Sequence, residues 1–400
     1  MRGSVRRNEG VLVLVLLASA AASAANAQDA GGGGRRFDVR LTARATYDSN
    51  VARGNQTVAT VRDVRPGDYI YEPRATIDLV LPMARQAVFL TGNVGYEFHQ
   101  YNKDLAREFI DLNGGARTTA GPCGVQLTGG ISRRQSNLED LALTVTRNTE
   151  QVLSAGASLQ CATPLGIGTT VGYQYSTQSN SADDVPGADT NGVSMGLVYS
   201  NRAIGKLALT GSYSKTDYSA DDELLNPQSG YEQYQGTLSL RREIGHRLAG
   251  QASIGYSSQK TEGRAESFHG VTGSGALTYR LNPRLDLGLN YNRNIDTSLD
   301  PNIDYVIDEL FGISATYRLS SRVSASLGAD VNKRNFRGEV TPSPTTISND
   351  ELKSVKGALT FKVGRRSSLA LNGQYEDRNA TPTIFSYTGY RVGIAISTDF

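Results

Sequence analysis

The chain has little of what a metalloprotein or an enzyme needs, with three histidines, two cysteines and no tryptophan among its 400 residues. No histidine has a serine or carboxylate at a spacing that predicts a catalytic triad or a metal site. The acidic pairs Asp183-Asp184 and Asp221-Asp222 fall in polar stretches and are interpreted as solvated loop charges rather than cation sites. We therefore expect no enzyme activity, no metal and no cofactor.

Long hydrophobic runs are also missing beyond the first 27 residues, which excludes membrane-spanning helices of about 18 apolar residues there. The negative mean hydropathy would normally indicate a soluble protein. That inference fails for β-barrels, whose strands alternate lipid-facing apolar residues with polar ones. The net charge is only +2 and no basic stripe occurs, so a nucleic-acid partner is not expected.

The amino-terminal segment has the pattern of a secretory signal peptide. Three arginines in the first seven residues precede an apolar run over 11–22 and the small-residue site Ala25-Asn26-Ala27. The run is too short to cross a bilayer comfortably, which favours cleavage near Ala27 over an uncleaved anchor. We expect a signal peptide over 1–27, a flexible glycine-rich segment over 28–36 and one domain over 37–400.

Short turn signals recur about every forty residues along that domain, a constant period that marks a repeated supersecondary unit. Longer polar stretches lie between them, so the unit is one β-hairpin with a tight turn at one end. Tight turns centre near residues 84, 121, 164, 203, 245, 282, 321 and 365. The long loops are expected at 50–69, 100–107, 135–149, 177–190, 218–229, 259–266, 293–304, 335–350 and 377–385.

The segments between turns alternate apolar and polar residues, as β-strands with two different faces require. Leu285, Leu287, Leu289 and Tyr291, for example, alternate with polar or small residues. A soluble sandwich or a β-helix could also alternate, but the loop asymmetry and signal peptide favour a barrel. We predict an all-β fold: a single closed antiparallel transmembrane barrel of eighteen strands, with sixteen as the alternative. Short turns and both termini would face the periplasm.

Aromatic residues near the outer strand ends fit the girdle that such barrels place at the lipid headgroups. They are Tyr96, Tyr173, Tyr213, Tyr256, Tyr291 and Tyr375. A barrel lipase would need a serine–histidine pair on this lipid-facing side, and the sequence predicts none.

A barrel of this width leaves an aqueous channel unless it is plugged, and 28–36 is too short to be a plug. A loop can still fold inward, and 50–69 is the longest candidate.

Residues of the opposite parity are expected to face the lumen and to set its selectivity. Both signs of charge occur among them, mixed with amides and hydroxyls, which suits a hydrated, weakly charged solute better than an ion filter. An ordinary solvated lumen is the alternative. The charged and amide members include Arg40, Arg44, Arg74, Asp78, Asn93, Glu97, Asp111, Arg117, Lys206, Arg241, Asp286, Asn290, Arg318, Asp330, Lys356 and Arg391.

Cys123 and Cys161 are predicted on adjacent strands, both on the lipid-facing parity and both near the periplasmic end. A cross-strand disulfide is favoured over two free thiols, because the periplasm oxidises such pairs. It would be structural rather than catalytic.

The segment 45–51, Ala-Thr-Tyr-Asp-Ser-Asn-Val, closes the first strand and resembles the putative β-barrel porin 2 family. The terminal Phe400 resembles the assembly signal that the barrel assembly machinery of Gram-negative bacteria reads. The resemblance covers the barrel layout and implies an outer-membrane protein linked to exopolysaccharide biosynthesis. Its partners would be outer-membrane lipids, the exported polysaccharide and periplasmic export components.

Three functions stay open at this point. An exopolysaccharide export conduit ranks first, a general or sugar-uptake porin second, and a barrel enzyme or adhesion scaffold last.

Overall fold

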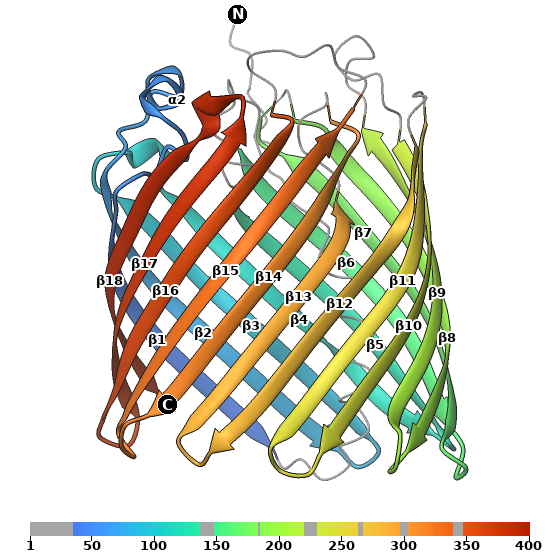
Figure 1. Cartoon of the computed structure of the whole chain (residues 1–400). Coiled ribbons are helices and arrows are strands. Elements are labelled where there is room, and N and C mark those ends of the chain that lie inside the picture. The colour runs from blue at the N-terminus through green and yellow to red at the C-terminus, as the bar shows by residue number, and fades with distance from the viewer. Residues whose placement is uncertain are drawn as a thin grey trace, which may run out of the picture.

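A computed structural model describes residues 35–136, 148–182, 185–219, 230–262, 267–296, 303–338 and 347–400. Within these ranges the chain forms one closed, eighteen-stranded antiparallel barrel (Figure 1). This confirms the predicted fold class and decides between eighteen and sixteen strands. The predicted signal peptide over 1–27, most of 28–36 and the acidic pairs Asp183-Asp184 and Asp221-Asp222 lie outside the described residues. No described helix is long and apolar enough to span a membrane.

Each strand pairs with its neighbours in the chain, and the ring closes where β1 pairs with β18. That seam aligns Arg40 with Asp399 and Asp48 with Arg391. The strands are β1 Arg36–Asp48, β2 Asp68–Met83, β3 Gln86–His99, β4 Arg107–Ala120, β5 Cys123–Gln135, β6 Thr149–Ala162, β7 Ile167–Asn180, β8 Gly187–Asn201, β9 Gly205–Ser219, β10 Gly230–Ile244, β11 Leu248–Glu262, β12 Ser267–Asn282, β13 Leu285–Asp296, β14 Tyr305–Arg318, β15 Val323–Arg337, β16 Asn349–Val363, β17 Ser367–Thr381 and β18 Tyr387–Asp399.

The eight tight turns lie at one end of the barrel, where β1 begins and β18 ends. Several reverse the chain through glycine at positive φ, as at Gly121, Gly245 and Gly364, a conformation that other residues rarely adopt. The strands run further toward the other end than the sequence predicted. For example, β7 continues to Asn180 and β17 to Thr381. The backbone keeps pairing there, although the side chains have become polar on both faces and no longer show alternation.

The two faces of the barrel differ as the alternation predicts. On β13, Leu287, Leu289 and Tyr291 are exposed on the outer face, whereas Asn290 lies on the opposite face. The girdle tyrosines Tyr173 and Tyr256 are also on the outer face, with 49% and 56% of their surface exposed. The apolar residues that would be buried in a soluble protein therefore form the outer surface, where lipid replaces water.

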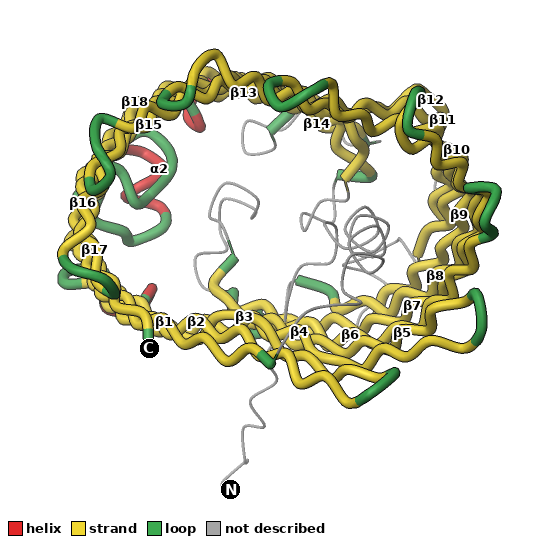
Figure 2. The backbone as a smooth tube through the Cα atoms, turned by 90° about the horizontal axis from the view of Figure 1, so that it is seen from below, coloured by secondary structure: helices red, strands yellow, loops and turns green. Residues whose placement is uncertain are grey.

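Among the described residues, three short helical turns lie in the loops at the far end: α2 Gln56–Val61, η2 Lys103–Leu105 and η3 Thr383–Phe385. The segment 49–67 between β1 and β2, here called loop 1, carries α2. Seen along the barrel axis, α2 lies inside the ring of strands, close to β16 (Figure 2). The loop that the sequence marked as the longest candidate for inward folding thus covers one side of the outer mouth.

Candidate functional site: the lumen and its inward-folded loop

The strand register places all sixteen predicted lumen residues on one face of the barrel wall. That face is the inner one, because a cavity of about 810 Å³ inside the barrel is lined by Arg44, Glu97, Lys356 and Arg391. Cross-strand pairing carries the same face around the ring, for example from Asn93 to Asp111 and from Lys206 to Arg241. The remaining members follow by the same pairing: Arg40, Arg74, Asp78, Arg117, Asp286, Asn290, Arg318 and Asp330.

Most lumenal charges on β1, β2 and β13 to β18 neutralise one another across strands. Arg40 lies 2.6 Å from Asp399 across the seam, and Lys356 lies 2.5 Å from Asp330. Further cross-strand ion pairs join Arg36 to Asp78, Arg44 to Glu72, and Arg318 and Arg280 of the neighbouring β12 to Asp286, and Arg74 pairs with Glu72 of its own strand. Because positive and negative charges alternate within hydrogen-bonding distance, this wall presents little net charge to a passing solute.

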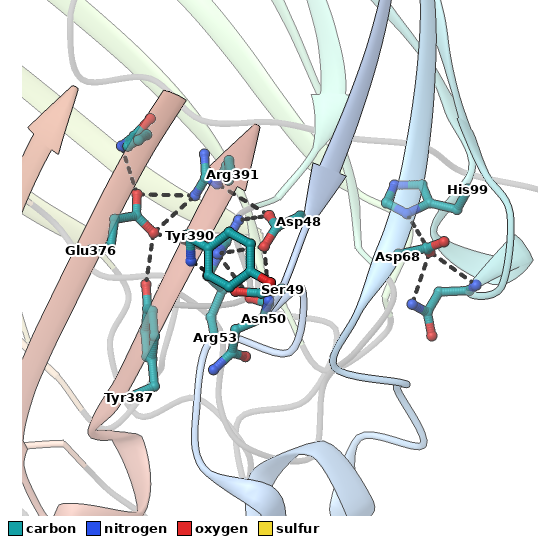
Figure 3. Close-up of polar contacts among 12 residues, drawn as sticks. Asp48, Ser49, Asn50, Arg53, Asp68, His99, Glu376, Tyr387, Tyr390 and Arg391 are labelled. Carbon is teal, nitrogen blue, oxygen red and sulfur yellow. Dashed lines mark hydrogen bonds and ion pairs between the residues drawn. The ribbon is translucent and has the colours of Figure 1, made fainter. Parts of the chain in front are cut away.

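The densest of these clusters lies where the seam meets loop 1 (Figure 3). The Asp48 carboxylate, 2% exposed, lies 2.5 Å from the Arg53 guanidinium and 3.1 Å from Arg391 Nε. Arg391 Nη2 in turn donates to both carboxylate oxygens of Glu376, at 3.1 and 3.2 Å. Arg53 Nη1 also lies 3.5 Å from Glu376. Two arginines and two carboxylates from β1, loop 1, β17 and β18 thus form one neutral, largely buried unit.

The family-like segment at the end of β1 makes the backbone contacts that start loop 1. Asp48 Oδ1 accepts a hydrogen bond from the Asn50 backbone N–H. Ser49 and Tyr390 exchange two bonds, because the Ser49 N–H donates to the Tyr390 carbonyl and the Tyr390 N–H donates to Ser49 Oγ. Asn50 Nδ2 donates to the Gly54 carbonyl. These contacts turn the chain sharply out of β1 and hold loop 1 against β18.

Apolar packing holds the rest of loop 1 in the mouth. Val58 of α2 is fully buried against Ala380 and Phe385, which flank the β17–β18 connection. Asn55 caps α2 through its side chain, and its backbone N–H donates to the Ile384 carbonyl. On the other side, Val51, Ala52, Ala59 and Val64 pack with Leu105 of the β3–β4 loop. Loop 1 is therefore a packed structure with its own small core.

The base of loop 1 is joined to the β3–β4 loop through Asp68. Its carboxylate accepts from the backbone N–H groups of Tyr101 and Asn102 and from Asn102 Nδ2, and His99 Nδ1 lies 3.0 Å away (Figure 3). No local pattern indicated this histidine–carboxylate pair, because the two residues are 31 positions apart on different strands. The pair is enclosed by structural hydrogen bonds, so we interpret it as an anchor for the two loops.

The opposite wall, formed by β7 to β12, has a different chemistry. Its lumenal residues are mostly serine, threonine, glutamine and glycine, and hydroxyl and amide groups bond across strands. Thr190 and Thr216 lie 2.8 Å apart, as do Ser253 and Ser274. In the described part of this wall, the lumenal charges are confined to the short-turn end, at Lys206, Arg241, Glu243 and Arg280. One half of the channel is thus lined by paired charges and the other by neutral polar groups.

Cys123 and Cys161 face each other across β5 and β6 and are joined in a disulfide. The bond lies beside the short-turn end on the lipid-facing parity, with Val125 and Leu159 as the next residues of that face.

The outer face holds a serine–histidine contact that the sequence analysis did not expect. Ser258 Oγ lies 2.9 Å from His269 Nδ1, and Ser267 Oγ lies 3.3 Å from His269 Nε2. The prediction that no such pair stands on this face was wrong, because Ser258 and His269 meet only through the β11–β12 register. Both ring nitrogens contact hydroxyl groups, so no carboxylate orients the imidazole as in a catalytic triad.

Comparison with known proteins identifies the barrel type. Residues 209–400 match the family model described as "Putative beta-barrel porin 2"; the match does not include segment 45–51. A BenF-like porin from Pseudomonas fluorescens Pf-5 aligns with a TM-score of 0.50 at 13% identity, covering 91% of this chain and 99% of that one. OccK2 (OpdF) from Pseudomonas aeruginosa, in complex with glucuronate, aligns with a TM-score of 0.51 at 11% identity, covering 91% and 98%.

No curated protein matches the chain. At such low identities the two structures show the fold alone, and the family match is confined to residues 209–400. The chain is therefore a porin-like outer-membrane β-barrel that carries, over residues 209–400, the sequence pattern of the β-barrel porin 2 family.

Proposed function

We propose that this barrel is a passive uptake channel for small hydrophilic solutes, including sugars. The observation that carries the proposal is a continuous polar inner face whose outer mouth is narrowed on one side by the packed loop 1. A narrowed, water-filled bore admits small solutes by diffusion. No energy source or catalytic group is needed for that process.

Uptake accounts for the lumen better than export of an exopolysaccharide, the function that the family resemblance implies. A polymer chain needs an unobstructed path through the mouth, whereas α2 lies inside the ring of strands (Figure 2) and is held there by the packing of Val58. The structurally similar BenF-like protein is also described as a porin. Export receives no comparable support, so it ranks second.

Liposome swelling tests the proposal directly. The full-length mature protein, refolded into liposomes, is expected to make them swell in isotonic glucose and more slowly in larger oligosaccharides. A size cut-off is the expected signature of a narrowed diffusion pore. Liposomes that stay impermeable to glucose would contradict the proposal.

A gene-deletion strain separates uptake from export. We expect slower growth on limiting sugar, restored by complementation, together with normal amounts of secreted polysaccharide. Polysaccharide retained in the cell, with unchanged sugar uptake, would instead support the export conduit.

A further inference from the structure

The neutral wall ends, toward the short-turn side, in two cations placed directly opposite each other. Lys206 of β9 and Arg241 of β10 are cross-strand partners in the register. Both side chains belong to the inner face, because Thr216 and Ser214 continue the parity of Lys206 along β9. Like charges directly opposite on adjacent strands repel each other and destabilise the pairing.

These two cations differ from the others on the barrel wall because no carboxylate compensates them. Among the described residues, neither Lys206 nor Arg241 has an ion pair or a side-chain hydrogen bond, whereas Arg40, Arg318 and Lys356 are each paired with an aspartate. Arg117 and Lys362 also lack such a partner, but the strand residues opposite them are uncharged, Gln126 and Ser368. Arg322, whose carbonyl accepts from the Lys362 backbone N–H, lies in the β14–β15 turn. In the strand register of the described residues, Lys206 and Arg241 are the one pair of cations that lie directly opposite each other.

The residues directly opposite this pair on the flanking strands are neutral and polar. Glu243 lies two residues further along β10 on the same inner face and, among the described residues, forms no ion pair with either cation. Ser200 is the partner of Lys206 on β8, and Gln251 is the partner of Arg241 on β11. A carboxylate bound between the two cations would remove their repulsion, and adjacent hydroxyl and amide groups could bond to the hydroxyls of the same solute. Lysine and arginine together offer several donors that converge on one anion.

We propose that Lys206 and Arg241 form a lumenal binding site for the carboxylate of a hydroxylated solute, such as a sugar acid. The inference rests on the proposed uptake function and names its substrate class. The neutral wall accommodates the hydroxyl groups along the bore, and the cation pair draws the carboxylate toward the periplasmic end. The self-neutralised wall opposite contributes little to this selection.

Two measurements with glucuronate as the probe test the site. The first is the ratio of liposome swelling rates in sodium glucuronate and in glucose. The variant Lys206→Gln/Arg241→Gln is expected to lower this ratio about threefold, because the local attraction for anions is lost. Arg40→Gln, which removes an ion-paired cation from the same inner face, is the matched control and should leave the ratio near wild type. The charge-conserving variant Lys206→Arg/Arg241→Lys should also preserve it.

The second measurement is calorimetric titration of the detergent-solubilised barrel with glucuronate, which does not depend on flux. We expect binding by the wild type and the Arg40→Gln variant, and affinity at least about tenfold weaker in the doubly neutralised one. Absence of wild-type binding, or equal effects of Arg40→Gln and of the double variant, would overturn the site. If liposomes with the wild-type barrel do not admit glucose, the proposed uptake function is wrong. The calorimetric titration would then still show whether Lys206 and Arg241 bind glucuronate.

Discussion

Asp48 and Arg391 face each other across the β1–β18 seam, with Arg391 Nε 3.1 Å from Asp48 Oδ2, and the same carboxylate holds Arg53 of loop 1. One side chain therefore takes part both in closing the ring and in positioning the loop over the mouth.

Asp48→Asn is expected to weaken both attachments. Removing one partner of a buried ion pair leaves the other charge uncompensated, at a cost of about 3 kcal/mol in the free energy of unfolding. The temperature at which the barrel loses its folded mobility in SDS gels should fall, and single-channel conductance should rise as loop 1 detaches. Asp399→Asn, which breaks an exposed seam pair, is the control and should change little. Equal effects of the two variants would contradict a special role for Asp48.

Val58→Asp should release loop 1 without altering any strand. Val58 is fully buried against Ala380 and Phe385, and a carboxylate cannot be accommodated there without a partner. We expect larger conductance and faster swelling in oligosaccharides, with normal resistance of the barrel to SDS. Val61→Asp serves as the control, because Val61 is on the same helix and its side chain is 52% exposed. If conductance is unchanged by Val58→Asp, loop 1 does not narrow the channel.

Loss of the disulfide should lower stability but not conductance. Replacing Cys123 and Cys161 by serine removes a link between residues 38 positions apart, for which restriction of the unfolded chain predicts about 3 to 4 kcal/mol. The heat-induced gel shift should occur at a lower temperature, and a reducing agent should reproduce the effect in the wild type alone. If the reducing agent also lowers the transition temperature of the serine variant, the shift does not report loss of the disulfide.

Deletion of Phe400 is expected to reduce the amount of barrel in the outer membrane of cells. The side chain is 62% exposed on the outer face, so refolding of the purified variant into detergent should proceed as for the wild type. Phe37→Ala is the control, because Phe37 is 63% exposed on the neighbouring strand and is not terminal. Equal losses in both variants would contradict an assembly signal at the terminus.

The strands could be predicted because their residues experience two solvents. Leu287 and Leu289 face lipid and Asn290 faces water, so apolar and polar residues alternate with a period of two along the sequence. Outside the membrane both faces meet water, and the pattern fades at residues such as Gln178 and Asn180. Backbone pairing continues there, which is why the predicted loops were too long.

The arrangement of the mouth could not be predicted in the same way. Loop 1 is held by contacts such as Asn55 with Ile384 and Val58 with Phe385, which are more than 300 positions apart and have no local signature. Parity indicated that Lys206 and Arg241 share the lumen with other charges. It could not show which cations have carboxylate partners, because that depends on side-chain reach between adjacent strands.

The order of the strands has a consequence for how a barrel with this topology can change over time. Every strand pairs only with its neighbours in the chain, except where β1 meets β18. A gain or loss of one hairpin would therefore alter the circumference of the barrel by a fixed step while leaving all other pairings intact, provided the two seam strands are kept. The width of such a pore can therefore change only by whole hairpins, whereas its selectivity can change by substitution of single lumenal side chains.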